Sequence, residues 1–272
     1  MYRDVAIRAA RAGGHILRQH FDFGTEVLTR DLDNVVTAAD RASEIAILSQ
    51  IRDALPAHAI FSEEEGASLT DSEYLWVIDP LDGTHNFVLG LPYFSISIAL
   101  LHLGRPILGV VYHPILDDLY VAERGKGATL NGETLCVADL SELRQATAYY
   151  DQGYAVGREA GLQLYTPIAR ATRRCLQMWA PALDWCSVAR GRGHLIITNA
   201  AEMEDKLAGM LILQEAGGVV TDWAGRSPRP VTIDTPDNNM VQNRTISLVG
   251  SVPGIHQAAL QLIQSALEVT QD

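Results

Sequence analysis

The sequence predicts an α/β protein made of two mixed halves, and three observations support this prediction. The chain has 272 residues, more than the roughly 100–200 residues of one ordinary domain. Apolar residues at helical spacing open the chain, and short apolar runs typical of strands fill residues 59–123. Both patterns mix after about residue 140. We therefore expect an N-terminal half over residues 1–143 and a C-terminal half over residues 144–272.

Helical spacing predicts two helices near the N-terminus. Residues 3–21 show it in spite of Gly13-Gly14, and residues 37–55 show it up to Pro56. The apolar positions are Val5, Ala9, Ala12, Ile16 and Leu17 in the first helix and Ile45, Leu48 and Ile51 in the second. The polar residues 24–34 between them predict a loop or short hairpin. Later helices are expected at residues 161–173, 182–190, 206–216 and 253–269.

Short apolar or alternating runs predict the strands. They comprise residues 59–61, 75–78, 94–103, 106–112, 119–123, 194–198, 219–221 and 246–250. Asn131-Gly132, between two short runs, is a strong signal for a hairpin turn.

The composition excludes two classes of protein. With 47% hydrophobic and 20% charged residues, general disorder is excluded. The net charge, 21 − 33 = −12, argues against a nucleic-acid-binding protein that works through a basic face. Three cysteines without metal-type spacing, and no apolar run of the ~18–20 residues that span a bilayer, favour a soluble cytoplasmic protein.

An apolar strand runs directly into two carboxylates at residues 76–87. Pro80 and Gly83 shape the backbone so that Asp79 and Asp82 can converge at the strand end. Convergent carboxylates repel one another unless a proton or a cation bridges them, and hard oxygen ligands suit Mg²⁺. Gly83 and Thr84 can also start a helix and offer backbone N–H groups to an anion. Taken alone, the segment is better explained as an ordinary Asp-rich turn.

Two further acidic segments change this balance. Glu63-Glu64-Glu65 follows an earlier apolar strand, and Asp205 opens an apolar helix. Each has an ordinary explanation, the first as a solvated loop and the second as a helix N-cap. Their occurrence together, in this order, is improbable as coincidence.

The combined pattern resembles the inositol monophosphatase superfamily. The matching segments are NVVTAAD (34–40), SEE (62–64), DPLDGTHNF (79–87), LNGETL (130–135), AEMEDKLAG (201–209) and EAGG (215–218). The resemblance implies a layered αβαβα sandwich of the inositol monophosphatase and fructose-bisphosphatase type. It also implies a Mg²⁺-dependent, lithium-sensitive phosphomonoesterase and a homodimer. The motifs are specific for the superfamily and much less so for the substrate.

The resemblance also assigns site residues. It implies two or three Mg²⁺ ions held by Glu63, Asp79, the carbonyl of Leu81, Asp82 and Asp205. Gly83 and Thr84 correspond to backbone donors that hold the phosphate. Thr84 with Asp40 corresponds to the dyad that helps deprotonate the attacking water, and Glu63 counts with them as catalytic.

The region expected to set substrate specificity departs from the inositol-type pattern. Trp179-Ala180-Pro181 replaces a run of small residues, and Thr198 stands where a hydroxyl-binding Glu is usual. Asp184, at a helix start, fits a pocket residue or an N-cap. Glu204 replaces a Trp, and the neighbouring Lys206 can bring positive charge near a metal. The candidate specificity residues are therefore Trp179, Ala180, Pro181, Asp184 and Thr198.

The expected reaction is hydrolysis of a small phosphorylated polyol or sugar-like metabolite by metal-activated water. Alternatives within the superfamily act on 3′-phosphoadenosine 5′-phosphate, fructose bisphosphate, histidinol phosphate or a biosynthetic intermediate. A non-catalytic sugar-phosphate-binding relative is a further alternative. No nucleic-acid polymer and no membrane is expected as a partner. Bound Mg²⁺ would make the field at the phosphate positive in spite of the net charge of −12.

Overall fold

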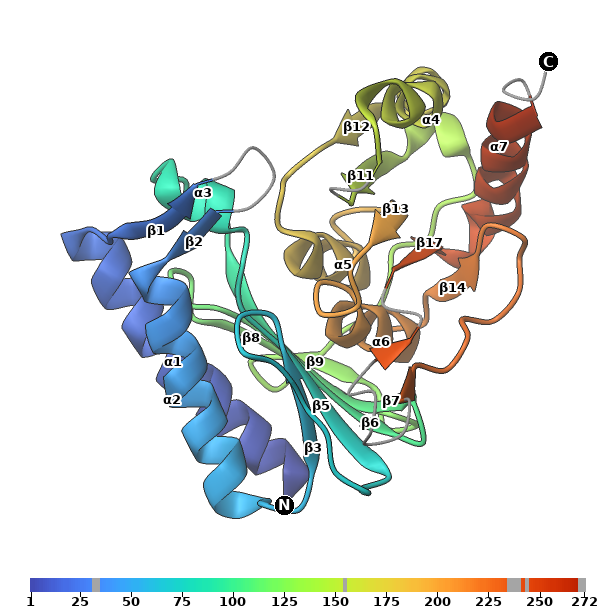
Figure 1. The fold of residues 1–272 in the computed structure, drawn as a ribbon. Coiled ribbons are helices and arrows are strands. Elements are labelled where there is room, and N and C mark those ends of the chain that lie inside the picture. Colours follow the sequence, from blue (N-terminus) through green and yellow to red (C-terminus); the bar gives the residue numbers. More distant parts are fainter. Residues whose placement is uncertain (31–34, 154–155, 234–240, 243–244, 269–272) are drawn as a thin grey trace.

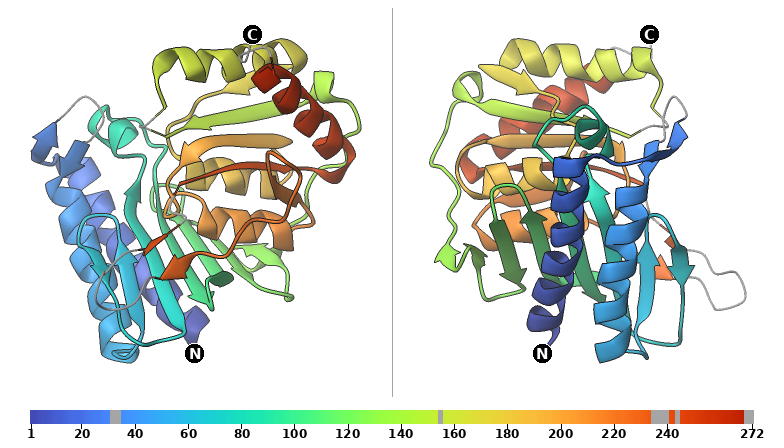
Figure 2. Two further views of the ribbon diagram at one scale, coloured as in Figure 1. Left: turned by 45° about the vertical axis from the view of Figure 1, so that its right-hand side comes forward. Right: turned by 90° about the vertical axis from the view of Figure 1, so that its left-hand side faces the viewer.

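A computed structural model describes residues 1–30, 35–153, 156–233, 241–242 and 245–268. Five layers follow one another: two helices, a large sheet, two helices, a smaller sheet and two helices (Figures 1 and 2). The helices are, from one outer layer to the other, α1 (Tyr2–Phe23) and α2 (Ala38–Ala54), α5 (Pro181–Ala189) and α6 (Leu207–Glu215), and α4 (Arg158–Ala171) and α7 (His256–Glu268). The expected αβαβα arrangement is confirmed.

The first sheet has eight strands in the order β10-β9-β8-β7-β6-β5-β3-β4. Their bounds are β3 Ala59–Ser62, β4 Gly66–Ser68, β5 Tyr74–Asp82, β6 Ser95–His102, β7 Arg105–His113, β8 Asp118–Glu123, β9 Ala128–Leu130 and β10 Glu133–Thr134. All neighbours pair antiparallel except β3 and β5, which pair parallel. Both faces of β5 are covered: Trp76 and Ile78 pack in the cluster under α1 and α2, and Leu75 and Val77 pack in the cluster under α5 and α6. The strand therefore reads as a continuous apolar run.

The second sheet has five strands in the order β12-β11-β13-β17-β14. Their bounds are β11 Thr147–Gln152, β12 Arg174–Leu176, β13 Leu195–Ala201, β14 Val219–Asp222 and β17 Ile246–Ser251. The remaining short elements are β1 Val27–Arg30, β2 Val35–Thr37, α3 Thr84–Val88, η1 Leu143–Gln145, β15 Thr232–Ile233, β16 Val241–Gln242 and η2 Pro253–Ile255. The sequence did not reveal β11 or β12.

The expected local signals agree with most of the fold, with two corrections. Residues 24–34 predicted either a loop or a short hairpin, and the antiparallel pairing of β1 with β2 shows the hairpin. Asn131 and Gly132 turn between β9 and β10 with φ of 51° and 88°, as a tight hairpin requires. Ile45 is 70% exposed, and the buried large apolar residues of α2 are instead Ile47, Leu48 and Ile51. The expected helix 161–173 starts earlier, at Arg158. Asn34, where the family resemblance begins, and Val269, where the last expected helix ends, lie outside the described residues.

Gly13 and Gly14 explain how α1 packs so closely. A Cβ on Gly13 would lie 2.7 Å from Ser43 Oγ of α2, and one on Gly14 would lie 2.7 Å from Tyr112 Cδ1 of β7. The two glycines, unfavourable for a free helix, therefore allow α1 to touch both α2 and the first sheet.

We predict that Gly14→Ala lowers the free energy of unfolding by about 1–3 kcal/mol, because the added methyl overfills a buried contact. Gly157→Ala is the matched control, since Gly157 has φ of −60° and a Cβ added there would meet no atom within 4 Å. Urea denaturation of both variants measures the effect. A Gly14→Ala protein as stable as the wild type would contradict the packing argument.

One hydrophobic cluster is shared by both parts of the chain. It contains Phe61 and Val77 from the first sheet together with Trp185 and Leu211 from α5 and α6. α6 lies so close to β7 that a Cβ on Gly109 would be 2.7 Å from the Ala208 carbonyl oxygen. Each of the ranges 1–143 and 144–272 has its own sheet, and their division at residue 143 remains a prediction.

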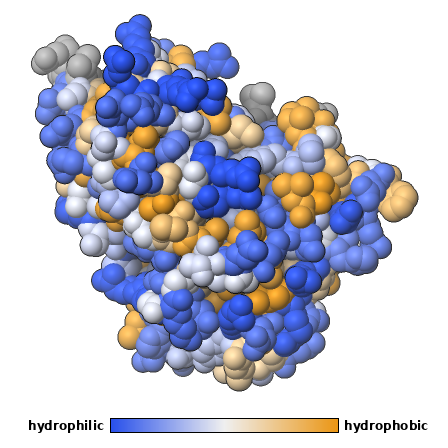
Figure 3. Space-filling model, turned by 180° about the vertical axis from the view of Figure 1, so that it is seen from behind, coloured by the Kyte–Doolittle hydropathy of each residue, from blue (hydrophilic) through white to orange (hydrophobic). Residues whose placement is uncertain are grey.

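The surface is mixed in character. Hydrophilic side chains cover much of the face seen from behind, and hydrophobic residues form separate patches among them (Figure 3). Among the described residues, no helix combines the length and apolarity needed to cross a membrane.

Candidate active site

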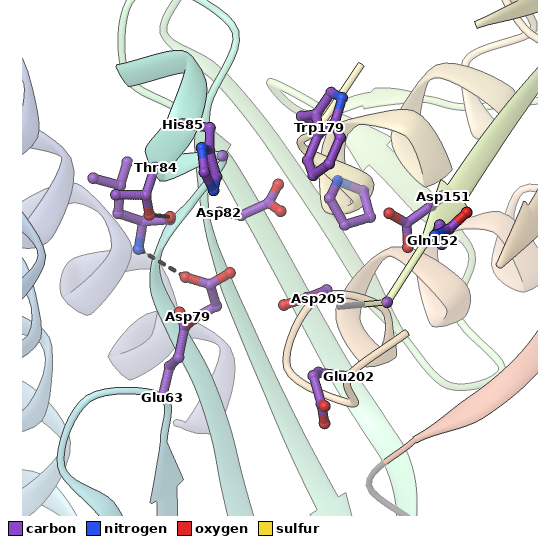
Figure 4. A pocket seen from close by; sticks show the side chains of 14 residues that line it. Glu63, Asp79, Asp82, Thr84, His85, Asp151, Gln152, Trp179, Glu202 and Asp205 are labelled. Carbon is purple, nitrogen blue, oxygen red and sulfur yellow. Dashed lines mark hydrogen bonds between the residues drawn. The ribbon is translucent and has the colours of Figure 1, made fainter. Parts of the chain in front are cut away.

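A pocket lies where the end of β5 meets α5, β11 and the segment before α6 (Figure 4). Carboxylates from both parts of the chain point into it. Its lining residues are Glu63, Asp79, Leu81, Asp82, Gly83, Thr84, His85, Asp151, Gln152, Gly153, Trp179, Pro181, Glu202 and Asp205.

The geometry of β5 brings Asp79 and Asp82 together. The strand does not end before the carboxylates, as the sequence suggested, but continues through Asp82 with an irregular register against β6. This irregularity allows both side chains to face the pocket. Asp79 Oδ1 accepts a hydrogen bond from the Leu81 N–H at 2.8 Å, and Asp82 Oδ2 accepts one from Ser95 Oγ at 2.9 Å.

Asp205 completes the cluster from the far side of the pocket. It precedes α6, and one carboxylate oxygen from each of Asp79, Asp82 and Asp205 lies within 4.8 Å of the other two. Burial, followed by repulsion from Asp82 and Asp205, raises the pKa of Asp79 well above its ordinary value. Burial likewise raises the pKa of Asp82 to about 8, and burial together with Glu204 and Glu63 raises that of Asp205. The three groups therefore oppose one another's ionisation.

The three acids after β3 have different surroundings. Glu63 lines the pocket, and its enclosed setting together with Asp79 and Glu204 raises its pKa. Glu64 has a pKa of about 7 through burial and the nearby carboxylates of Asp40 and Glu44. Glu65 pairs with Arg52 on the surface. Of the three, only Glu63 is a lining residue of the pocket.

The hydroxyl of Thr84 lies between two acceptors. Thr84 Oγ1 is 3.1 Å from Asp40 Oδ1 and 3.0 Å from the Leu81 carbonyl oxygen. Asp40 is fixed in turn, because its Oδ2 accepts the N–H and the hydroxyl of Thr37 in a capping box at the start of α2. The pKa of Asp40 is raised, mainly by burial, against the lowering effect of these hydrogen bonds.

Gly83 precedes α3 in a conformation that excludes side chains. Its φ is 94°, and a Cβ there would lie 3.0 Å from Ala180 Cβ and 3.2 Å from the Trp179 carbonyl oxygen. The turn that presents Thr84 is therefore pressed against the segment before α5. This contact links the motif after β5 to the C-terminal part of the chain.

Known proteins resemble this chain over most of its length. The profile of the inositol monophosphatase family matches residues 2–267. The chain belongs to the inositol monophosphatase family. The chain is 39% identical to the Nus factor SuhB of Pasteurella multocida over 228 residues, which cover 82% of the chain and 85% of that protein.

Two further comparisons agree. Inositol monophosphatase 2 of Solanum lycopersicum is 37% identical over 244 residues, covering 82% of this chain and 87% of that protein. The solved structure of an inositol monophosphatase from Anabaena (Nostoc) superposes with a TM-score of 0.82 at 32% identity, covering 97% of this chain and 95% of the other. These similarities support a phosphatase of the superfamily.

The acidic cluster of this inositol monophosphatase family member fits magnesium. Every candidate ligand is an oxygen, and His or Cys is absent from the described cluster, as a hard cation requires. Oxygens that share one Mg²⁺ at about 2.1 Å lie at most about 4.2 Å apart, close to the 4.8 Å limit of the cluster. A divalent cation would neutralise the negative charge that makes these carboxylates repel one another.

The candidate specificity residues separate into two groups. Trp179 and Pro181 line the pocket, and Trp179 is 52% exposed with a φ of 56° that bulky residues rarely adopt. Ala180, Asp184 and Thr198 are buried and are not lining residues. Asp184 Oδ1 accepts a hydrogen bond from Tyr93 Oη at 2.7 Å, and Thr198 Oγ1 accepts one from the Leu248 N–H. These three can influence the pocket only through their neighbours.

Sequence reasoning missed Asp151, Gln152, Gly153 and Glu202, which also line the pocket. The first three lie at the end of β11, a strand that the apolar pattern did not reveal, and Glu202 lies in the acidic segment before α6. His85, which was expected to have no role, lines the pocket with its ring centroid 5.7 Å from that of Trp179.

Lys206 is not a lining residue of the pocket, and its influence on a metal beside Asp205 stays a prediction. Its side chain is fully buried, and Nζ donates to the carbonyl oxygens of Ala201 and Ile246. Burial lowers its pKa to about 8, although Asp205 and other acids nearby act in the opposite direction. The lysine therefore links the segment around Asp205 to the backbone of β13 and β17.

Proposed function

We propose that this chain is a Mg²⁺-dependent phosphomonoesterase that hydrolyses a small phosphorylated polyol or sugar-like metabolite. The observation that carries the proposal is the convergence of Asp79, Asp82 and Asp205 within 4.8 Å. Glu63 and the Leu81 carbonyl adjoin this cluster as further oxygen ligands. When bound, Mg²⁺ supplies a Lewis acid for the phosphate oxygens and lowers the pKa of water.

Thr84 and Asp40 are proposed to accept the proton of the attacking water. When Thr84 Oγ1 donates to Asp40 Oδ1, at 3.1 Å, the lone pairs of the hydroxyl are available to a water in the pocket. The water proton then passes to Thr84 as the threonine proton passes to Asp40. Burial, which raises the pKa of Asp40, makes this carboxylate a better proton acceptor.

The backbone at Gly83 and Thr84 is proposed to hold the phosphate beside the metal ligands. The left-handed conformation of Gly83 turns the chain from β5 into α3, next to Asp82. Phosphoryl transfer depends mainly on positioning and charge neutralisation. A fixed turn that adjoins the carboxylates supplies the positioning.

Thr84→Val should lower kcat by about 100-fold or more with little change in KM, because it removes the proton path and keeps the side-chain shape. Steady-state phosphate release at saturating Mg²⁺ measures the effect. Thr84→Ser retains the hydroxyl and serves as the control, with kcat within about tenfold of the wild type. A Thr84→Val enzyme with near-normal kcat would remove the dyad from the mechanism.

The function itself is tested by phosphate release from a substrate panel, with Mg²⁺ and with excess EDTA. The panel contains inositol 1-phosphate, glycerol phosphates, fructose 1,6-bisphosphate, 3′-phosphoadenosine 5′-phosphate and histidinol phosphate. Magnesium-dependent release from a polyol phosphate supports the proposal. Binding of Mg²⁺ and ligand without release from any substrate would instead favour a non-catalytic relative. Lithium inhibition and a homodimer remain predictions from the family resemblance.

A further inference from the structure

Asp151 faces the pocket because of its place in β11. Tyr149, two residues earlier, packs in the cluster under α5 and α6, whereas Ala148 and Tyr150 pack on the opposite face of the sheet. Side chains alternate along a strand, so Asp151 points to the same side as Tyr149. It lines the pocket across from the carboxylates of β5, near Trp179 (Figure 4).

The protein satisfies the carboxylate of Asp151 only in part, through the Gln152 N–H and the nearby charge of Lys206. Asp151 Oδ2 is buried and has no hydrogen-bond partner among the described residues. Thr198, its register partner on β13, is fully buried and directs its hydroxyl oxygen to the Leu248 N–H. An enclosed carboxylate oxygen without a donor is costly unless a ligand supplies one.

The rest of the pocket narrows the chemistry of such a ligand. Asp151, Gln152 and Glu202 form the side of the pocket opposite β5, and none of the lining residues is Lys or Arg. A second phosphate on the substrate would meet like charge at this side. A group that donates hydrogen bonds, or carries positive charge, would meet complementary acceptors.

We propose that Asp151 binds a hydrogen-bond donor, a hydroxyl or an ammonium group, on the alcohol part of the substrate. The inference rests on the proposed phosphatase function and names the feature by which the pocket selects among phosphate esters. Trp179 borders the same space and supplies an apolar wall for the carbon chain of that alcohol.

Three matched esters test the proposal: propyl phosphate, 3-hydroxypropyl phosphate and 3-aminopropyl phosphate. They differ only in the terminal group, so the ratio of kcat/KM for each polar ester to that for propyl phosphate reports recognition of that group. We expect at least one polar ester to exceed propyl phosphate in the wild type. Asp151→Ala should lower that ratio by about 10- to 100-fold, mainly through KM, as expected for loss of a hydrogen bond to a charged group.

Asp151→Asn identifies which donor is bound. It keeps an acceptor oxygen and removes the charge, so it should weaken the preference for the amino ester far more than that for the hydroxyl ester. Asp151→Glu retains the carboxylate and should restore part of the preference. Glu159→Gln is the control, because it removes one negative charge from the exposed first turn of α4, outside the pocket lining.

The outcomes separate this proposal from the proposed function. Equal ratios for the wild type and both Asp151→Ala and Asp151→Asn, with Mg²⁺-dependent turnover intact, would overturn the role of Asp151 alone. No Mg²⁺-dependent turnover of any ester by the wild type would overturn the phosphatase proposal itself. Thermal melting of each variant identifies any loss of folding. If Asp151→Ala or Asp151→Asn does not fold, the ratio of kcat/KM values measured for Asp151→Glu tests the proposal instead.

Discussion

Asp205→Asn is expected to abolish turnover and, at the same time, to stabilise the protein when metal is removed. The carboxylate lies within 4.8 Å of Asp79 and Asp82, and its pKa is raised by burial, Glu204 and Glu63. A neutral amide removes one of the mutually repelling charges. It also removes a charged oxygen ligand that a divalent cation needs, so kcat/KM should fall by about 1,000-fold or more, or about 4 kcal/mol.

Two measurements on Asp205→Asn test this pair of effects together. Phosphate release at saturating Mg²⁺ reports the catalytic loss, and thermal unfolding with and without Mg²⁺ reports metal binding. The wild type should gain about 2.7 kcal/mol at a Mg²⁺ concentration 100 times Kd, and the variant should gain much less. Asp71→Asn, which changes an exposed acid, is the control. A variant with near-native activity at high Mg²⁺ would remove Asp205 from the site.

The metal-free protein is expected to lose stability as the pH rises from about 4 to 8. Burial raises the pKa of Asp82 from 3.8 to about 8, and burial and neighbouring carboxylates raise those of Asp79 and Asp205. A carboxyl whose folded-state pKa lies above its unfolded value binds more protons in the native state. Its contribution is present below the unfolded pKa and is lost as the pH rises through the folded pKa.

The size of this pH effect follows from the same shifts. One pKa unit corresponds to about 1.4 kcal/mol, so a loss on the order of 2 kcal/mol or more is expected between pH 5 and pH 8 in EDTA. Saturating Mg²⁺ should flatten the dependence, because a bound cation favours the ionised carboxylates. Urea denaturation across this pH range, with EDTA or with Mg²⁺, measures it. Stability that rises with pH in EDTA would contradict the assigned direction.

Sequence patterns predicted most of the fold because its strands and helices have strong periodicity. β5 is apolar on both faces, and α1 and α2 have buried faces at helical spacing, so their patterns are clear. β11 reads TAYYDQ, which has neither a run of aliphatic residues nor a regular alternation, and its burial depends on packing against α5 and α4. Ile45 shows that the pattern can also mislead: it fits the helical spacing of apolar residues in α2 but is 70% exposed.

Some residues of the candidate site could be predicted from sequence motifs, and others could not. Asp79, Asp82 and Asp205 stand in contiguous motifs, and the structure brings them together as the resemblance implied. Asp151 lies in no such motif, and its place in the pocket arises from the packing of β11 on the face shared with α5 and α6. Glu202 lies within the motif of residues 201–209, but the resemblance assigned it no role. Thr198 shows the reverse case: its position in the sequence suggests the pocket, but β17 covers its hydroxyl.

The close approach of β7 to α6 has a consequence for how such a chain can change during evolution. Gly109 leaves room for the Ala208 carbonyl, directly after the Asp205 segment, so the helix and the first sheet must vary as a matched pair. α4 instead packs mainly against α7, β11 and β12, all within the second half of the chain. Changes in α4 are therefore accommodated within the second half, whereas an exchange of one half between distant relatives would also have to preserve the contact between β7 and α6 beside the carboxylate cluster.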